Sequence, residues 1–279
     1  MSDRQDGDTE VSSLLKNIYS CADKSSWYDS VAEAYDRTRP RYPAEIIARM
    51  QEIAQLQPNK SVLEIGAGPG IASIELAKLG AETICLEPSL SACKLGRAKC
   101  AVYANVEFVN TTFEDWNLGE HQFDAVIATT SFHWITPEIR NQKTAAALKD
   151  NGLLILLWNT PPQPSYQVHQ TLTEVYLTHA PELAKYEGHQ NYRQNLAAIA
   201  NETIESGYFR DLIAQQQISQ ITYTIDDYLA LLSTLSPYIR LDSPQRSLLF
   251  AELKRVLKLH YGDRLKLSYL SLLQIAYKS

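Results

Sequence analysis

The chain has 279 residues, which is enough for one large α/β domain with a substantial core. Hydrophobic residues make up 45% and charged residues 21%, and 11 Gly and 12 Pro are too few for a collagenous or low-complexity chain. The formal net charge of −6 gives no overall positive field to attract nucleic-acid phosphates. These values predict a folded protein and disfavour nucleic acid as a partner.

The amino-terminal segment MSDRQDGDTE is polar and acidic, so we expect residues 1–10 to be disordered. It lacks the basic and then apolar pattern of a secretory signal, and no run elsewhere approaches the roughly 18 apolar residues of a membrane-spanning helix. The 4 cysteines show no CxxC spacing, which fits reduced thiols. We therefore expect a cytoplasmic location and no membrane partner.

Residues 11–57 are expected to form an N-terminal helical lid, because apolar residues near its start recur at helical spacing. Its second half is rich in aromatic and arginine residues. Pro40 and Pro43 there predict a stiff bend between two helices. Trp27 and Tyr35 are candidates to cover a ligand.

Short apolar runs alternate with amphipathic stretches in residues 58–160, as in parallel sheets covered by helices on both faces. This alternation predicts five strands, at 62–65, 82–87, 106–109, 123–128 and 153–158, and helices at 70–79, 90–101 and 137–149.

The alternation stops after a proline-rich stretch. Residues 161–215 are then predicted to be a mostly helical cap, and residues 216–279 to complete the sheet in an antiparallel manner. The predicted strands there lie at 217–223 and 266–277, with helices at 226–235 and 244–259. The predicted fold is α/β, a doubly wound Rossmann-like sheet of about seven strands with a helical cap inserted after the fifth strand.

A glycine-rich turn, Gly66-Ala67-Gly68-Pro69-Gly70, follows the first predicted strand directly. Glycine permits positive φ and removes side chains that would hold a ligand away from the backbone. The spacing is GxGxG rather than the GxGxxG of dinucleotide sites, and the nearby Glu64 carboxylate would repel a diphosphate. The turn therefore favours a cationic cofactor without phosphate, although a turn with no ligand is the alternative.

Glu87 ends the second predicted strand, 23 residues after Glu64. In sheets of this kind an acidic residue about 20 residues after the glycine turn accepts hydrogen bonds from ribose hydroxyls. The pairing of the turn with this carboxylate predicts a nucleoside.

The segment from Glu64 to Gly70 resembles motif I of class I S-adenosylmethionine-dependent methyltransferases, an acidic residue followed by xGxGxG. Glu87 stands where that family keeps its ribose-binding acid. Residues 111–116 resemble its adenine-contacting loop, with Phe113 in place of the usual small residue, and 123–127 resemble its fourth strand. The resemblance covers roughly residues 35–160.

The resemblance implies S-adenosylmethionine as the cofactor. Glu64, Gly66 and Gly68 would hold its methionine portion, Glu87 its ribose, and the loop from Thr112 to Glu114 its adenine. Arg39 and Arg41 are candidates to bind a carboxylate of the methionine portion or of an acidic acceptor, because guanidinium groups make bidentate contacts with carboxylates. The alternative is a solvated basic bend. The full set of expected cofactor-binding residues is Arg39, Glu64, Gly66, Ala67, Gly68, Glu87, Pro88, Thr112, Phe113, Glu114 and Thr129.

Three further segments resemble the small-molecule branch related to trans-aconitate methyltransferase and the type 11 group. They are YDRTRPRYP at 35–43, SFHW at 131–134 and the carboxyl-terminal LKLSYLSLLQIAYKS. The resemblance implies methyl transfer to a small-molecule acceptor, a carboxylate or a hydroxyl.

His133 is the candidate general base, because it follows the fourth strand and imidazole titrates near neutral pH. The alternative is a hydrogen-bonded wall residue between Phe132 and Trp134. The other five histidines have no metal-ligand spacing, so no metal is expected.

Three alternative functions remain. One is methyl or methylene transfer to a lipid alkene, as in cyclopropane fatty acid synthases. The second is an NAD-dependent oxidoreductase, and the third is a non-catalytic S-adenosylmethionine-binding protein. The sequence predicts no oligomeric state.

Overall fold

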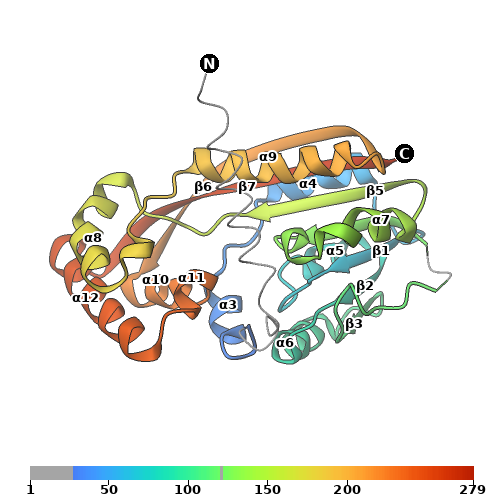
Figure 1. Ribbon diagram of the computed structural model, residues 1–279. Coiled ribbons are helices and arrows are strands. Elements are labelled where there is room, and N and C mark those ends of the chain that lie inside the picture. Colours follow the sequence, from blue (N-terminus) through green and yellow to red (C-terminus); the bar gives the residue numbers. More distant parts are fainter. Residues whose placement is uncertain (1–27, 120–121) are drawn as a thin grey trace, which may run out of the picture.

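A computed structural model describes residues 28–119 and 122–279. The predictions for residues 1–10, for Trp27 and for the first helix of the lid lie outside this part. Seven strands form one sheet in the order β3-β2-β1-β4-β5-β7-β6 (Figure 1). Their bounds are β1 Ser61–Ile65, β2 Glu82–Leu86, β3 Val106–Val109, β4 Phe123–Thr129, β5 Leu148–Asn159, β6 Phe209–Thr224 and β7 Arg264–Lys278.

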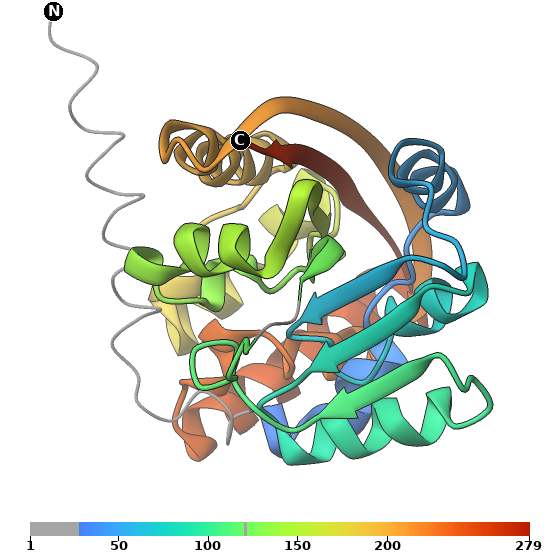
Figure 2. The same cartoon turned by 90° about the vertical axis from the view of Figure 1, so that its right-hand side faces the viewer.

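The sheet is parallel from β3 to β5 and antiparallel at β7 and β6. This confirms the predicted seven-stranded, doubly wound sheet with an antiparallel finish. Successive residues of a strand point to opposite faces, so each face carries its own apolar layer. Helices cover both layers (Figures 1 and 2).

Helices α4 (Ala44–Ala54) and α5 (Ser73–Leu79) pack on one face, where Met50 and Leu76 join Ile127 in a buried cluster. On the other face, Ala145 of α7 (Pro137–Ala147) and Ile199 of α9 (His189–Glu205) pack with strand residues. Helix α6 (Leu90–Cys100) packs beside β3.

Helix α5 begins at Ser73, three residues later than predicted, because residues 68–72 form turns instead of a first helical turn. Its predicted end is confirmed: Gly80 has φ 86° and caps the helix. The predicted bend between two N-terminal helices is confirmed as well. Helix α3 (Ala32–Thr38) ends before an extended stretch that contains both prolines, and α4 follows.

The segment after β5 is helical, as predicted, and contains α8 (Tyr166–His179), the short helix η2 (Pro181–Leu183) and α9. Its predicted limit at 215 is wrong, because β6 already begins at Phe209. Helices α10 (Ile225–Leu232), α11 (Ser236–Ile239) and α12 (Ser243–Tyr261) pack against α8 in a second core. In the described ranges, none of the helices combines the length and the apolar character of a membrane-spanning segment.

Candidate functional site

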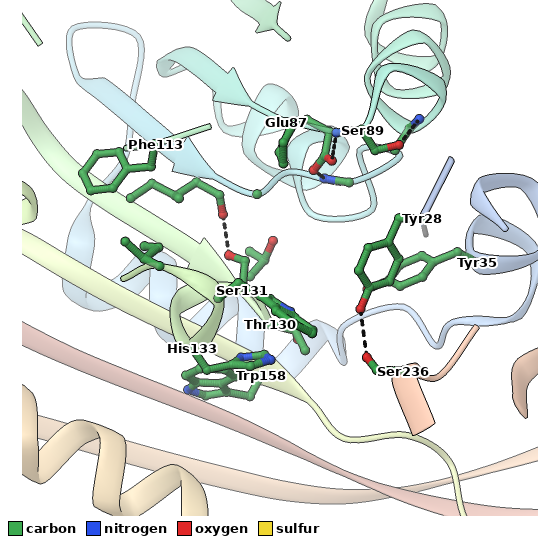
Figure 3. Close-up of a pocket in the computed structure, with 18 of the residues that line it drawn as sticks. Tyr28, Tyr35, Glu87, Ser89, Phe113, Thr130, Ser131, His133, Trp158 and Ser236 are labelled. Atoms are coloured by element: carbon green, nitrogen blue, oxygen red, sulfur yellow. Dashed lines mark hydrogen bonds between the residues drawn. The ribbon is translucent and has the colours of Figure 1, made fainter. Parts of the chain in front are cut away.

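A cavity of about 840 Å³ lies at the carboxyl ends of β1, β2, β4 and β5. This edge of a parallel sheet is where ligands bind in doubly wound folds. Residues of α3, α9 and α11 close the cavity from the other side. Figure 3 shows Glu87 and Ser89 on one side, His133 and Trp158 on another, and Tyr28 and Tyr35 reaching in from the N-terminal segment. The volume is in the upper part of the usual range of about 300–1,000 Å³ for ligand sites, so it accommodates a nucleoside together with a small acceptor.

The glycine turn uses the left-handed conformation that its glycines permit, with φ 65° at Gly66 and 57° at Gly68. A Cβ atom at Gly66 would lie 2.6 Å from Cβ of Ser131, so the loop after β4 packs directly on the turn. At Gly68, by contrast, a Cβ atom would meet nothing within 4 Å. Only Gly68 therefore leaves open space for a ligand.

The amides of the turn are already engaged within the protein. Ala67 N–H donates to Leu86 O at 3.0 Å, Gly68 N–H to Glu87 Oε2 at 2.7 Å, and Gly70 N–H to Ala67 O at 3.1 Å. Pro69 has no N–H to offer. A diphosphate needs several such donors, so residues 67–70 do not form a phosphate cradle.

Glu87 accepts two backbone hydrogen bonds, one on each carboxylate oxygen: from Gly68 N–H, as above, and from Ser89 N–H at 2.8 Å. Its side chain lines the cavity although the residue is only 7% exposed. Burial raises the pKa of Glu87 to about 7, and the two N–H donors counteract part of that rise. Each oxygen keeps a lone pair for a further donor, as two ribose hydroxyls require.

Glu64 does not line the cavity. It is completely buried and accepts hydrogen bonds from Ser73 Oγ at 2.5 Å and Thr129 Oγ1 at 3.0 Å. Burial raises the pKa of its carboxyl group, and these hydroxyl donors oppose that rise. Glu64 therefore reaches the cavity only through Thr129, which does line it. Ala67 is also buried and faces a smaller neighbouring pocket instead.

The predicted adenine loop lies at the cavity wall. Pro88, Thr112, Phe113 and Glu114 all line it. Phe113 is 3% exposed, and the Lys143 ammonium lies 5.2 Å from its ring centre. Glu114 Oε1 accepts the N–H of Thr136 at 3.0 Å, which ties the loop to the start of α7.

Of the arginines in the proline-rich bend, only Arg39 lines the cavity. Its guanidinium lies 4.6 Å from the Tyr35 ring centre and donates to Thr234 Oγ1 at 3.1 Å and to Thr234 O at 3.2 Å. Arg41 pairs with Asp36 at 3.2 Å instead. The smaller pocket beside Gly66 and Gly68 is also lined by Arg39, which places a cation next to the turn.

His133 lies in the short helix η1 (Phe132–Trp134) and lines the cavity. Its ring centre is 5.0 Å from that of Trp134 and 5.6 Å from that of Trp158. Trp158 is fixed by a 2.9 Å hydrogen bond from Nε1 to Gln274 Oε1. The histidine thus packs against two indole rings shortly after the end of β4.

Sequence reasoning missed the cavity residues that come from distant parts of the chain. Tyr28 lines the cavity and shares a 3.3 Å hydrogen bond with Ser236 Oγ of α11, 208 positions away. Tyr192 and Asn195 face the cavity from α9. The helical spacing of the apolar residues in 189–205 was the available signal, but it did not show which face meets the cavity.

The sheet order and the cavity at the carboxyl ends of its parallel strands define a Rossmann-like class I methyltransferase fold. Residues 62–152 match the family described as methyltransferase domain. An uncharacterised methyltransferase of Mycobacterium tuberculosis is 31% identical over 138 residues, which cover 50% of this chain and 54% of that protein. The chain thus spans about half the length of this curated relative.

Solved structures support the fold. A protein of Anaeromyxobacter dehalogenans, solved as a candidate type II methyltransferase, has a TM-score of 0.60 at 17% identity, covering 86% of this chain and 97% of that one. Phosphoethanolamine N-methyltransferase 2 of Haemonchus contortus, solved with phosphomonomethylethanolamine and S-adenosylhomocysteine, has a TM-score of 0.52 at 14% identity, covering 92% and 58%. The chain thus contains a segment that matches a methyltransferase domain, and these solved structures share its fold.

Proposed function

We propose that the protein transfers a methyl group from S-adenosylmethionine to a small-molecule acceptor. The observation that carries this proposal is the combination of Glu87 with the engaged turn. A buried carboxylate with lone pairs to spare suits a ribose, and a turn without available amides does not suit a diphosphate. Together they favour a nucleoside that carries no phosphate.

The residues present fit the donor along its whole length. Thr112 and Phe113 would flank the adenine, Glu87 would accept from the ribose hydroxyls, and Gly68 leaves space for the ligand. Arg39, beside the turn, would pair with the carboxylate of the methionine portion. When bound, S-adenosylmethionine supplies an electrophilic methyl group on a sulfonium.

The protein's own task is then to position the acceptor and exclude water. His133 would take the proton from an acceptor hydroxyl, a contribution of roughly 10²- to 10⁴-fold for a well-placed base. A carboxylate acceptor needs no such base. Methylation of a carboxylate or a hydroxyl, in the trans-aconitate-related or type 11 branch, is the finer form of this proposal.

The test begins with binding. The full chain is titrated with S-adenosylhomocysteine and, separately, with NADH in a calorimeter. Binding of S-adenosylhomocysteine without binding of NADH is the expected result, and the reverse would establish the oxidoreductase alternative.

Incubation with methyl-tritiated S-adenosylmethionine and a small-metabolite extract is then expected to give labelled product. Binding without any product in such pools would identify a non-catalytic binding protein, and label in the lipid fraction alone would point to a lipid alkene acceptor.

A further inference from the structure

The side of the cavity opposite the glycine turn is built by the cap and by α11. We call these residues the cap wall: Tyr192, Asn195, Leu196, Ala198, Ile199, Leu235, Ser236 and Pro237. Those from α9 recur at helical spacing, so one face of this helix lines the cavity. None of the residues expected to bind the donor lies on the cap wall, which leaves it to the acceptor.

The cap wall carries no charged side chain. The acid at its edge, Glu202, is already paired with the buried Arg140 at 2.6 Å. The exposed Arg240 also lines the cavity, three residues beyond Pro237. In the described residues Arg39 has no carboxylate partner, and the proposed function assigns it to the donor. An anionic acceptor against the cap wall would have only the solvent-exposed Arg240 as a counter-ion. An exposed cation compensates little for the cost of burying a charge.

A cationic acceptor is disfavoured by the same arginine. The Arg39 guanidinium covers the ring of Tyr35 at 4.6 Å and acts electrostatically on the Tyr192 hydroxyl. Burial raises the pKa of Tyr192 to about 12, so this hydroxyl is uncharged at neutral pH. The acids that line the cavity are engaged: Glu202 by Arg140, Glu114 by Thr136 and Asp115 by Thr112. With the Arg39 charge beside the rings, these contacts disfavour an ammonium group, although such rings bind cations elsewhere.

Aromatic rings from three separate elements converge on this space. Tyr28 precedes α3, Trp134 ends η1 and Tyr192 comes from α9. Tyr28 meets Trp134 edge-to-face, with ring centres 6.0 Å apart. Among the described residues, the Tyr192 hydroxyl has no hydrogen-bond partner. Rings in such an arrangement bind another flat ring by stacking and edge contacts.

We propose that the acceptor is an uncharged, planar aromatic or conjugated molecule with a hydroxyl group, bound between the cap wall and Trp134. This inference rests on the proposed function and names its substrate class. The acceptor oxygen forms a bond to the methyl carbon as the bond from that carbon to sulfur breaks. The sulfur keeps the electron pair of the broken bond, and the hydroxyl proton passes to His133, so a methyl ether and S-adenosylhomocysteine result.

The test uses four probes of similar size on the full chain saturated with S-adenosylhomocysteine. These are 2-naphthol, its anionic analogue 2-naphthoate, the cationic 2-naphthylmethylammonium and the non-planar decahydro-2-naphthol. We expect 2-naphthol to bind, and each of the other three to bind about tenfold more weakly or less, from the cost of an unpaired buried charge or the loss of ring contacts. Equal or tighter binding of a charged or non-planar probe would overturn the proposal.

Variants of the cap wall separate a binding role from a structural one. Tyr192→Leu is expected to weaken 2-naphthol binding about fivefold or more, while Tyr192→Phe, which keeps the ring, stays near the wild-type value. Both are expected to keep their affinity for S-adenosylhomocysteine. Tyr208→Leu, at an exposed tyrosine outside the cavity, is the matched control. Unchanged 2-naphthol binding by Tyr192→Leu would contradict the inference. Failure of the wild-type chain to bind S-adenosylhomocysteine would instead contradict the proposed function itself.

Discussion

Glu87 links the glycine turn to the second strand through its two carboxylate oxygens, because Oε2 accepts from Gly68 and Oε1 from Ser89. The hydrogen-bond chain continues outward, since Ser89 Oγ donates to Asp29 Oδ1 at 2.6 Å. This bond and one from Ser91 N–H lower the pKa of Asp29. One residue thus orders the turn, the start of α6 and the segment before α3 around the proposed ribose site.

Replacing Glu87 with alanine should weaken binding of S-adenosylhomocysteine by about 2 kcal/mol, or about thirtyfold. The reason is that the substitution removes the charged carboxylate that would accept hydrogen bonds from both ribose hydroxyls. Calorimetric titration measures this change. Glu107→Ala, at an exposed position of β3, is the control and should bind normally. Unchanged affinity in a folded Glu87→Ala protein would contradict the proposal that Glu87 binds the ribose.

The pH dependence of binding should report the same carboxylate. Burial raises its pKa to about 7 in the unliganded protein, while binding of two hydroxyls requires the ionised form. Affinity should therefore be constant above about pH 8 and fall below pH 7 by up to about tenfold per pH unit, as one proton must be released on binding. Dissociation constants for S-adenosylhomocysteine between pH 5.5 and 8.5 test this, and Glu87→Gln should flatten the profile. A flat wild-type profile would show that Glu87 does not titrate with binding.

Residues of the site that follow a strand directly were predictable from the sequence. Gly66 and Gly68 belong to a glycine turn directly after β1, and Glu87 directly follows β2. The carboxyl ends of parallel strands lie at one edge of the sheet, so the sequence predicts that these residues are neighbours. Glu64 was predicted from the same segment, but its neighbours Ser73 and Thr129 enclose it. Enclosure depends on tertiary packing, so the sequence pattern did not reveal it.

At the scale of elements, Gly68 of the glycine turn can be compared with Gly207, which lies just before β6. Gly68 and Gly207 both have positive φ, 57° and 76°, and a Cβ atom at either meets nothing within 4 Å. Valine at either position should cost about 1–2 kcal/mol of stability from the left-handed backbone. Only Gly68→Val should also abolish S-adenosylhomocysteine binding, since Gly207 lies outside the cavity.

Thermal melts and calorimetric titrations of the two glycine variants provide the measurement. We expect both proteins to melt at similarly lowered temperatures, with Gly207→Val binding normally. Retained binding by Gly68→Val would mean that the turn is only a structural connection. Loss of binding in both variants would instead indicate a general effect of destabilisation.

Strand β6 shows why an element was partly missed. Its first half, from Phe209 to Gln216, is mostly exposed and groups its apolar residues at 212–214, and its pairing with β7 is shifted between Arg210 and Ile213. Such a stretch has no alternating pattern. It is a strand because β7, whose residues are mostly buried, supplies its hydrogen-bond partners. A long-range pairing of this kind leaves no local signal in the sequence.

At the scale of the whole molecule, the cavity joins parts that are distant in the sequence. The hydrogen bond between Tyr28 and Ser236 connects the N-terminal segment to α11, and Arg39 binds Thr234 just before it. Helix α10 packs on α3. The strand ends, the loops after them and Arg39 provide the donor half of the cavity, whereas the acceptor half also needs Tyr28, α9 and α11.

Because Arg39 joins the donor half to Thr234 beside α11, binding of S-adenosylhomocysteine should protect both of these segments from amide hydrogen exchange. A ligand at 100 times its dissociation constant stabilises the liganded state by about 2.7 kcal/mol, which slows every local opening that breaks the site. We expect slower exchange in 28–39 and 235–240, as well as in 61–70 and 84–90, by mass spectrometry. Amides of α12 that exchange by local opening are the internal control, because none of its residues lines the cavity. Protection confined to the strand ends would show that donor binding does not stabilise the segment 28–39 or α11. The donor half and the acceptor half of the cavity would then bind their ligands independently.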